Sequence, residues 1–236
     1  MSQRQIILDT ETTGIRFEDG HRLIEIGCVE MINRKLTGQY FHCYVNPERD
    51  IDAGAVAIHG ITRDFLLDKP LFLKIAKDFI DFVDGAELII HNAPFDVGFL
   101  NNELTLTQQK YRNLEQYCKI IDTLPMARRM HAGQRNSLDA LCKRYGIDNS
   151  KRDLHGALLD ANLLAQVYLA MTGGQGSFFD ALGGNQNTDR QEANKQIDNS
   201  KVYNIAVYKV SNEEAAAHEE YLSMLKKGGK CLWQED

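Results

Sequence analysis

The stretch Arg4-Gln-Ile-Ile-Leu-Asp-Thr-Glu-Thr-Thr-Gly14 decides how the rest of the chain is interpreted. Its first half is a short apolar run, which predicts a buried β-strand over residues 4–9. Side chains alternate along a strand, so Asp9 and Glu11 share one face and Thr10 points to the other. Two carboxylates at the end of a buried strand repel each other unless a cation lies between them. Because hard oxygen ligands favour Mg²⁺ or Mn²⁺, the stretch is a candidate divalent metal site. An Asp-x-Glu triplet alone also occurs by chance, and it is the apolar strand before it and Thr12-Thr13-Gly14 after it that favour the metal site.

A second acidic residue is expected near the same edge of the fold. The apolar run over 88–91 predicts another short buried strand, and Pro94 suits the first turn of a helix that follows it. Asp96 would then lie in that first turn, with its side chain directed back toward the strand ends. Taken alone, Asp96 is explained better by a favourable interaction with the helix dipole than by a functional role.

A third motif is His155-Gly-Ala-Leu-Leu-Asp160. A separation of five residues places two side chains about 140° apart around a regular helix. His155 and Asp160 therefore converge only if His155 lies on the loop before the helix, which Gly156 permits. Taken alone, a histidine near a helix start usually has a structural or solvent-exposed role.

The pattern of residues divides the chain into three parts. Residues 1–172 predict one α/β domain with a mixed central sheet flanked by helices. Residues 173–200 contain five Gly and eight Asn or Gln, and this composition predicts a flexible linker. Residues 201–236 contain a strand-like run over 202–210 and a helix that starts with a capping box at Ser211. That helix, of roughly 15 residues, is marginal on its own in water.

The expected elements of the domain follow from hydrophobic periodicity and from the positions of Gly and Pro. In addition to the strands over 4–9 and 88–91, they are strands over 21–35 and 36–46 with a turn at Thr37-Gly38, and helices over 71–83, 137–145 and 155–171.

Composition excludes several classes of protein. The 236 residues are 43% hydrophobic and 25% charged, which rules out a wholly disordered or fibrous chain. No apolar run approaches the ~18 residues that span a bilayer, and no signal peptide is expected. Five cysteines without a C-x-x-C pair indicate reduced thiols in the cytoplasm rather than a disulfide framework or a zinc site.

Charge is unevenly distributed along the chain. The net charge is −6, which argues against a nucleic-acid partner when taken alone. Residues 108–152, however, contain ten bases and four acids, a local net charge of +6. Solvated helix faces explain such a cluster in isolation, whereas a nucleic-acid backbone is the alternative partner.

In combination, the motifs resemble those of the DEDD exonucleases of the ribonuclease-H-like fold, in the subgroup with His in place of Tyr. The flanking sequences LDTETTG, HNAPFD, RNSLDALCKRY, DNSKR and LHGALLDA are similar to the proofreading epsilon subunits of bacterial DNA polymerase III. The resemblance covers most of residues 4–172 and extends into the tail. It implies a 3′-to-5′ DNA exonuclease of the bacterial replisome that releases nucleoside 5′-monophosphates.

The resemblance also implies roles for individual residues. Two divalent cations, Mg²⁺ or Mn²⁺, would be held by four carboxylates, and His155 would be the general base. Substrate contacts would come from two further residues together with three of the ligands. The implied metal ligands are Asp9, Glu11, Asp96 and Asp160, and the implied substrate-binding residues are Asp9, Glu11, Thr12, His59 and Asp160. Relatives usually carry a Glu where this chain has Gly54, which puts one substrate contact in doubt.

Partners are implied by the linker and the tail. Residues 175–179 resemble the short peptide that docks on a bacterial sliding clamp, with Gln175, Phe178 and Phe179 as anchors. Residues 201–236 correspond to the part that holds the polymerase catalytic (alpha) subunit, and the resemblance allows a small accessory (theta) subunit on the exonuclease domain. The substrate would be a single-stranded or mispaired DNA 3′ end that a partner delivers, and no membrane is involved.

Three alternatives compete with this interpretation. The first is an RNA-trimming 3′-to-5′ exonuclease of the same superfamily, although such enzymes usually end with the catalytic domain. The second is a phosphatase with an Asp nucleophile, which would need, together with an Asp-x-Asp motif, a downstream arrangement of a Lys and an acid pair that we do not find. The third is a non-catalytic scaffold subunit, which the presence of all five catalytic positions argues against.

Overall fold

The computed structural model describes residues 4–150, 152, 154–173 and 211–228. The chain divides into two compact units, residues 1–184 and residues 185–236. In the second unit the helix predicted after Ser211 is present as α9 (Asn212–Gly228). The predicted linker, the clamp-binding peptide 175–179 and the strand-like run 202–210 lie outside the described residues. None of the described helices is both long enough and apolar enough to cross a membrane.

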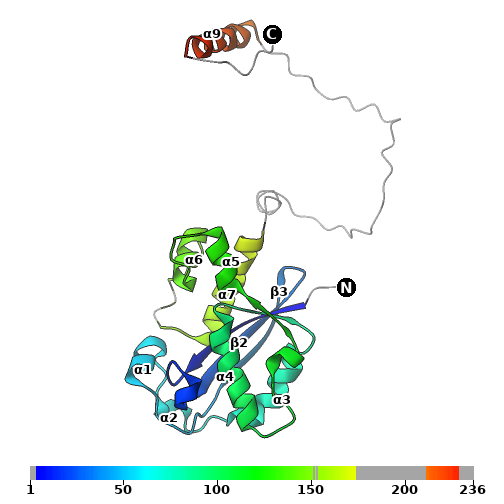
Figure 1. The fold of residues 1–236 in the computed structure, drawn as a ribbon, viewed down its shortest axis with the longest axis vertical. Coiled ribbons are helices and arrows are strands. Elements are labelled where there is room, and N and C mark those ends of the chain that lie inside the picture. The colour runs from blue at the N-terminus through cyan, green and yellow to red at the C-terminus, as the bar shows by residue number, and fades with distance from the viewer. Residues whose placement is uncertain (1–3, 151, 153, 174–210, 229–236) are drawn as a thin grey trace, which may run out of the picture. The chain divides into compact units, whose positions relative to one another are not determined.

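A five-stranded mixed sheet forms the centre of the first unit (Figure 1). The order is β3-β2-β1-β4-β5, with β1, β2 and β3 antiparallel and with β4 and β5 parallel to β1. The prediction of a mixed sheet flanked by helices is confirmed. The strands are β1 (Arg4–Thr12), β2 (Leu23–Ile32), β3 (Lys35–Tyr44), β4 (Glu87–Ile90) and β5 (Lys119–Asp122).

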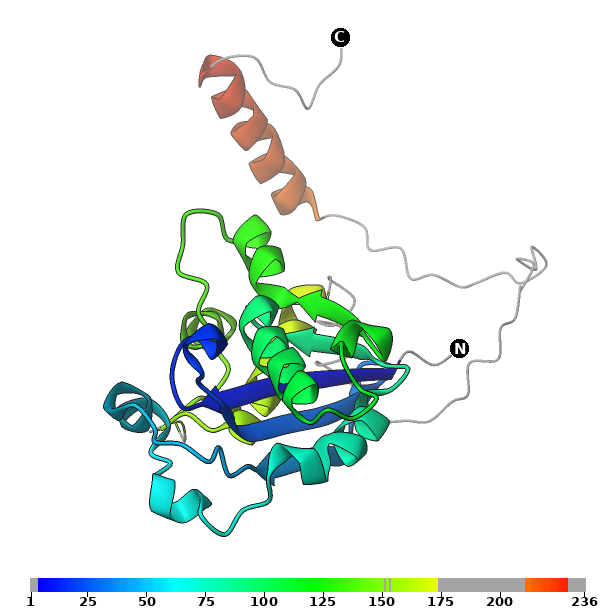
Figure 2. The ribbon, with the colours of Figure 1, turned by 60° about the horizontal axis from the view of Figure 1, so that its bottom comes forward.

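Helices cover both faces of this sheet (Figure 2). On one face Ile6 and Leu8 pack in a core with α3 (Phe72–Val83) and α4 (Ala93–Leu106). On the other face Ile7 packs with α5 (Thr123–Met130), α6 (Leu138–Tyr145) and α7 (Ala157–Thr172). The alternation along β1 therefore sends odd-numbered side chains toward α7 and even-numbered ones toward α4.

Two short helices lie between β3 and α3. They are α1 (Ala53–His59) and α2 (Arg63–Leu66), and Gly60 ends α1 with a φ of 71°. Single 3-10 turns at Phe17–Asp19 and Leu114–Gln116 complete the described elements. The sequence patterns predicted none of these four elements, nor β5 and α5.

The β2–β3 hairpin differs from the prediction. Asn33 and Arg34 form its two-residue turn, and both adopt the left-handed conformation, with φ of 50° and 64°. The turn predicted at Thr37-Gly38 is wrong, since both residues lie inside β3. Gly38, with a φ of 83°, instead lies where the pairing register shifts, which is the second common use of a left-handed glycine. The Arg34 guanidinium donates to Leu169 O and Thr172 Oγ1 in the last turn of α7.

Local signals set the helix ends close to their predicted positions. The Ser137 hydroxyl accepts a hydrogen bond from Ala140 N at the start of α6, and Gly146 ends that helix in the left-handed conformation. Helix α7 begins at Ala157 rather than at His155. His155 therefore lies on the preceding loop, the position that the spacing of the third motif requires.

Candidate active site

Strand β1 supplies the first two acids of the site. Asp9 and Glu11 both point toward α7, as the alternation predicts, and they pair across the sheet with Gly27 and Glu25 of β2. Glu11 is buried, whereas Asp9 keeps part of its surface exposed. Both lie at the carboxyl end of the strand, where the loop to β2 begins.

Helix α4 supplies Asp96 from the opposite side of the sheet. β4 ends at Ile90, and Asn92 turns the chain in the left-handed conformation, with a φ of 66°, before α4 begins. Asp96 lies in the first turn of α4, as predicted, and only 4% of its surface is exposed. The Thr10 hydroxyl, on the other face of β1 from Asp9, donates to Asp96 Oδ1 over 2.6 Å. Thr10 therefore orients an acid of the site although its own side chain points away from the other two.

Helix α7 supplies Asp160, and the loop before it supplies His155. Ligand atoms of Glu11, His155 and Asp160 all lie within 4.8 Å of one another. His155 Nδ1 is 3.8 Å from Asp160 Oδ2. Asp160 is 2% exposed, whereas the His155 side chain is 43% exposed. The histidine is thus accessible beside a buried carboxylate.

The proximity of the acids and their burial shift the pKa values of three of them. Burial raises the pKa of Asp9 well above its usual value, and the charges of Asp96, Glu11 and Asp160 raise it further. Burial likewise raises the pKa of Glu11 to about 8, with Asp160 as the next cause. Burial raises the pKa of Asp96 to about 7, although the Thr10 hydrogen bond opposes this shift.

Such a set of carboxylates fits divalent cations. The pKa values of Asp9 and Glu11 are raised by burial and by the neighbouring acids, and a cation bound among these carboxylates would relieve that repulsion. Their donors are the oxygens that Mg²⁺ and Mn²⁺ prefer. The neighbouring His155 adds one nitrogen. The donor set contains no thiolate among the described residues, which argues against a structural zinc site.

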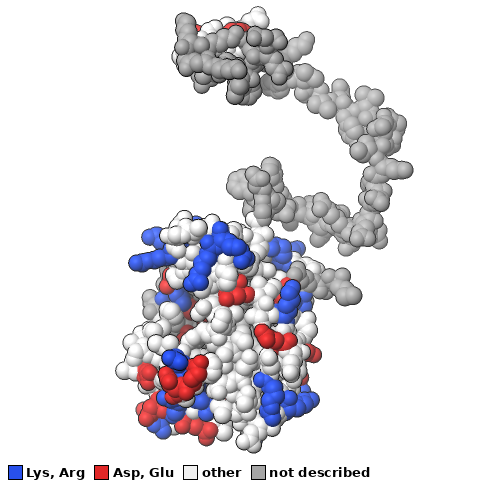
Figure 3. All heavy atoms as spheres, in the orientation of Figure 1, with Lys and Arg blue, Asp and Glu red and all other residues white. Residues whose placement is uncertain are grey.

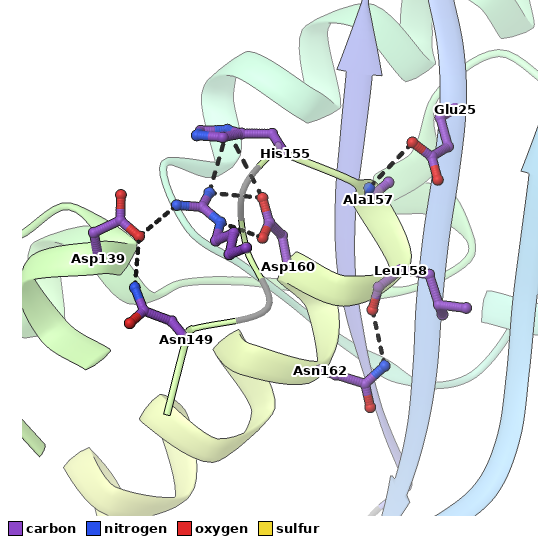
Figure 4. Close-up of polar contacts among 9 residues, drawn as sticks. Glu25, Asp139, Asn149, His155, Ala157, Leu158, Asp160 and Asn162 are labelled. Carbon is purple, nitrogen blue, oxygen red and sulfur yellow. Dashed lines mark hydrogen bonds and ion pairs between the residues drawn. The ribbon is translucent and has the colours of Figure 1, made fainter. Parts of the chain in front are cut away.

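One basic side chain lies directly against this set. Arg152 donates from Nε to Asp160 Oδ1 over 2.5 Å and from Nη2 to Asp160 Oδ2 over 2.7 Å (Figure 4). It also contacts Asp139 Oδ1 at 2.6 Å and His155 Nδ1 at 3.2 Å. The sequence places Arg152 among the ten bases of residues 108–152 and at the end of the motif DNSKR, but nothing in this local pattern indicates a partner eight residues away.

Two residues of β2, Glu25 and Gly27, position the N-terminus of α7. The sequence patterns indicated neither of them. Glu25 Oε2 accepts a hydrogen bond from Ala157 N over 3.2 Å, and Glu25 Oε1 contacts His42 Nε2 at 2.7 Å. A Cβ atom on Gly27 would lie 2.2 Å from Leu158 N, so only glycine lets the helix approach this closely. These long-range contacts carry no local sequence signal.

A largely apolar cavity of about 350 Å³ adjoins Glu11. Ile15, Ile58 and Phe95 line it, together with Thr12 and His59. Ile15 is 81% exposed, which is unusual for a large aliphatic side chain and suits contact with a flat apolar ligand. His59 is buried, its Nδ1 accepts from Ile61 N, and its Nε2 has no hydrogen-bond partner among the described residues.

Gly54 lines the same cavity, and a Cβ atom there would meet nothing within 4 Å. A longer side chain at this position would therefore have room to enter. The Thr12 hydroxyl donates to Gly14 O over 2.6 Å, so this predicted substrate residue also shapes the loop after β1.

Comparison with known proteins assigns the family. The exonuclease family model matches residues 6–168. DNA polymerase III subunit epsilon of Escherichia coli K12 is 51% identical, over 98% of this chain and 97% of its own length. The chain belongs to the family of DNA polymerase III epsilon subunits. The epsilon subunit of Rickettsia felis is 50% identical, over 96% of this chain and 98% of its own length.

The fold comparison agrees. A structure of exonuclease X in complex with 5′-overhanging duplex DNA matches with a TM-score of 0.57 and 27% identity, over 73% of this chain and 93% of that one. The predicted family, the exonuclease fold and the 3′-to-5′ proofreading exonuclease of DNA polymerase III are confirmed by membership of the epsilon family. The phosphatase alternative is thereby excluded.

Proposed function

We propose that the chain removes nucleotides one at a time from the 3′ end of DNA, at the site formed by Asp9, Glu11, Asp96, Asp160 and His155. The carrying observation is the convergence of four carboxylates and an accessible histidine beside an apolar cavity. Acids held this close raise one another's pKa, and a structural role alone gives no reason to keep them together.

The four carboxylates would hold two divalent cations, either Mg²⁺ or Mn²⁺. Divalent ions at such a site stabilise charge on the phosphate and generate a nucleophile at neutral pH. Asp9 and Glu11 would bind from β1, Asp160 from α7, and Asp96 from α4 with Thr10 holding its orientation.

His155 would accept a proton during hydrolysis. Burial and the positive charge of Arg152 lower its pKa below the usual value, so that it is neutral near pH 7 and able to act as a base. Its exposure and its place on a loop allow it to reach the incoming phosphate. The terminal nucleotide would lie in the cavity next to Thr12 and His59.

The DNA backbone would follow the basic surface over α5 and α6. Lys and Arg side chains gather there (Figure 3), including Arg128 and Arg129 in the last turn of α5 and Lys143 and Arg144 in the last turn of α6. Because the whole chain is acidic, such binding is weak, and a partner that delivers the primer end is needed.

We further propose the three-part division of the chain and its partners. The exonuclease domain would span 1–172, with a theta-like accessory subunit on it. The linker would span 173–200, with a clamp-binding peptide at Gln175, Phe178 and Phe179. The segment 201–236, which includes α9, would bind the polymerase alpha subunit, and the chain would thus act in the cytoplasmic replisome. The family is that of a polymerase III subunit, which supports an assembly of this kind.

The deciding experiment is digestion of a 5′-labelled primer with a mispaired 3′ end, with and without divalent cation. We expect stepwise shortening that needs the cation and that Asp9→Ala abolishes. Intact primer with the wild-type chain and Mg²⁺, or near-normal shortening by Asp9→Ala, would refute the proposal. Faster digestion of single-stranded RNA than of single-stranded DNA would favour the RNA-trimming alternative. Truncation after residue 180 should keep the activity and lose the alpha subunit.

A further inference from the structure

Arg152 engages both oxygens of a carboxylate that the proposed function assigns to a metal. The guanidinium forms two parallel bonds of 2.5 and 2.7 Å with Asp160, a fork-to-fork geometry that is among the stronger polar contacts in proteins. The Arg152 side chain is 7% exposed and that of Asp160 is 2% exposed. Water therefore screens this pair little.

The same carboxylate belongs to the cluster whose ligand atoms lie within 4.8 Å of one another. A cation among these atoms would take an Asp160 oxygen and would repel the guanidinium that holds it. Among the described Lys and Arg residues, Arg152 is the one that forms a salt bridge with an acid of the site. Competition for Asp160 is therefore direct and involves this one side chain.

A second acid is positioned to retain the displaced guanidinium. Asp139, on α6, accepts from Arg152 Nη1 over 2.6 Å, and Asn149 Nδ2 donates to the same oxygen over 3.0 Å. The Asp139 side chain is 57% exposed and lies outside the acid cluster. Arg152 can thus release Asp160 without being left unpaired.

The position of the Arg152 guanidinium also affects His155, the proposed base. Arg152 Nη2 lies 3.2 Å from His155 Nδ1, and a guanidinium only donates, so this contact occupies the lone pair of Nδ1. His155 N donates to Ile58 O, which anchors the loop on the other side. Movement of the guanidinium toward Asp139 would free Nδ1 while the backbone stays attached.

We propose, resting on the proposed function, that Arg152 is an internal competitor of the catalytic cation: it holds Asp160 and His155 Nδ1, and it releases both and keeps only its bond to Asp139 when a divalent ion takes the carboxylate. Arg152 is thus a positioning residue that sets the metal affinity of the site. It couples occupation of the metal site to the availability of the base.

Direct titration of the full chain with Mn²⁺, followed by electron paramagnetic resonance of the free ion, tests this inference. Arg152→Gln should bind Mn²⁺ about tenfold more tightly than wild type, which corresponds to about 1.4 kcal/mol. Asp139→Asn removes the alternative partner and should weaken binding. Arg144→Gln is the matched control, since this α6 arginine donates to Asn136 Oδ1 and Arg135 O and to no carboxylate of the described residues. In the absence of DNA, the Mn²⁺ affinity of this variant should equal that of the wild type.

The Arg152→Lys variant distinguishes direct competition for the Asp160 carboxylate from a general effect of positive charge on Mn²⁺ affinity. Lysine keeps the charge but not the fork, so this variant should resemble Arg152→Gln. Wild-type affinity in Arg152→Lys together with tighter binding in Arg152→Gln would overturn direct competition. Unchanged or weaker binding in Arg152→Gln would also overturn it. Asp139 is largely exposed, so Asp139→Asn tests the inference even if Arg152→Gln fails to fold. A wild-type chain that binds no Mn²⁺ would instead refute the proposed function.

Discussion

Glu25 and Ala157 are 132 residues apart in sequence, yet the Glu25 carboxylate accepts a hydrogen bond from the Ala157 backbone N–H. Ala157 is the first residue of the helix that carries Asp160, and Glu25 pairs across the sheet with Glu11. The Glu25 side chain therefore connects β2, the strand that pairs with β1 beside Glu11, to α7, the helix that bears Asp160. Its negative charge at the start of α7 also complements the helix dipole.

Gly27→Ala should destabilise the protein by about 1–3 kcal/mol, the usual cost of inserting an atom into a packed contact. The added Cβ would lie 2.2 Å from Leu158 N and 2.3 Å from the carbonyl carbon of Ala157, and backbone atoms cannot rotate away. Urea denaturation measures the loss. Gly54→Ala is the control, since its Cβ meets nothing within 4 Å, and equal stability of the two variants would contradict the close approach.

Glu25→Ala should lower stability more than Glu25→Gln does. Alanine leaves the buried Ala157 N–H without its acceptor, at a cost of about 1–3 kcal/mol, and it also removes the partner of the exposed His42 ring. Glutamine keeps one acceptor oxygen. Thermal denaturation of the two variants side by side measures the difference, and identical melting temperatures would show that the acceptor does not matter.

Thr10→Val should reduce exonuclease activity most strongly near neutral pH. The Thr10 hydroxyl favours the ionised form of Asp96, so its removal raises the pKa of Asp96 further above about 7. The rate deficit should shrink as the pH rises toward 9, where Asp96 ionises in both proteins. Thr10→Ser keeps the donor and should retain the wild-type profile. A deficit in Thr10→Val that does not change with pH would count against this role.

His155→Ala should lower the turnover rate by roughly 100-fold or more, the usual contribution of a general base. The four acids remain, so Mn²⁺ binding should persist, and added imidazole should restore part of the rate. His131→Ala removes a histidine that contacts the Tyr145 hydroxyl, and it should leave the rate unchanged. An unaltered pH–rate profile in His155→Ala would exclude His155 from the role.

Stability of the chelated protein should fall as the pH rises from 6.5 to 8.5. Burial raises the pKa of Glu11 to about 8 and that of Asp96 to about 7, whereas both are ionised in the unfolded chain above pH 5. The folded state thus binds more protons in this window, and its stability decreases with pH. Melting curves in EDTA test this. Excess Mg²⁺ should reverse the trend, and a flat profile in EDTA would contradict the raised pKa values.

Local patterns were sufficient to predict the core of this site. The alternation along β1 places Asp9 and Glu11 on one face, and Pro94 in the first turn of α4 places Asp96 in the same turn. The spacing of the third motif requires His155 to precede its helix, and it does. Each of these predictions depends on geometry within a few residues, which the backbone repeats of strands and helices determine.

Contacts between distant segments could not be predicted in this way. Gly27 is used for a helix approach rather than a turn, and Glu25 meets its partners only after the sheet and α7 have packed. The hairpin turn was misplaced because Gly38 is a strong turn signal, whereas Arg34 rarely adopts the left-handed conformation. The side-chain bonds of Arg34 to α7 hold that conformation, and they depend on a helix 120 or more residues away.

Residues of the β2–β3 hairpin therefore contact both ends of α7. Glu25 contacts its first residue, and Arg34 contacts its last turn. The helix has 16 residues, or about 24 Å of length. Gly173 directly follows it, so a tensile load applied through the downstream chain enters at the end that Arg34 anchors. Such a load would act on the Arg34 contacts before it acted on Asp160, so the hairpin would keep the position of the Asp160 carboxylate independent of tension on the downstream chain.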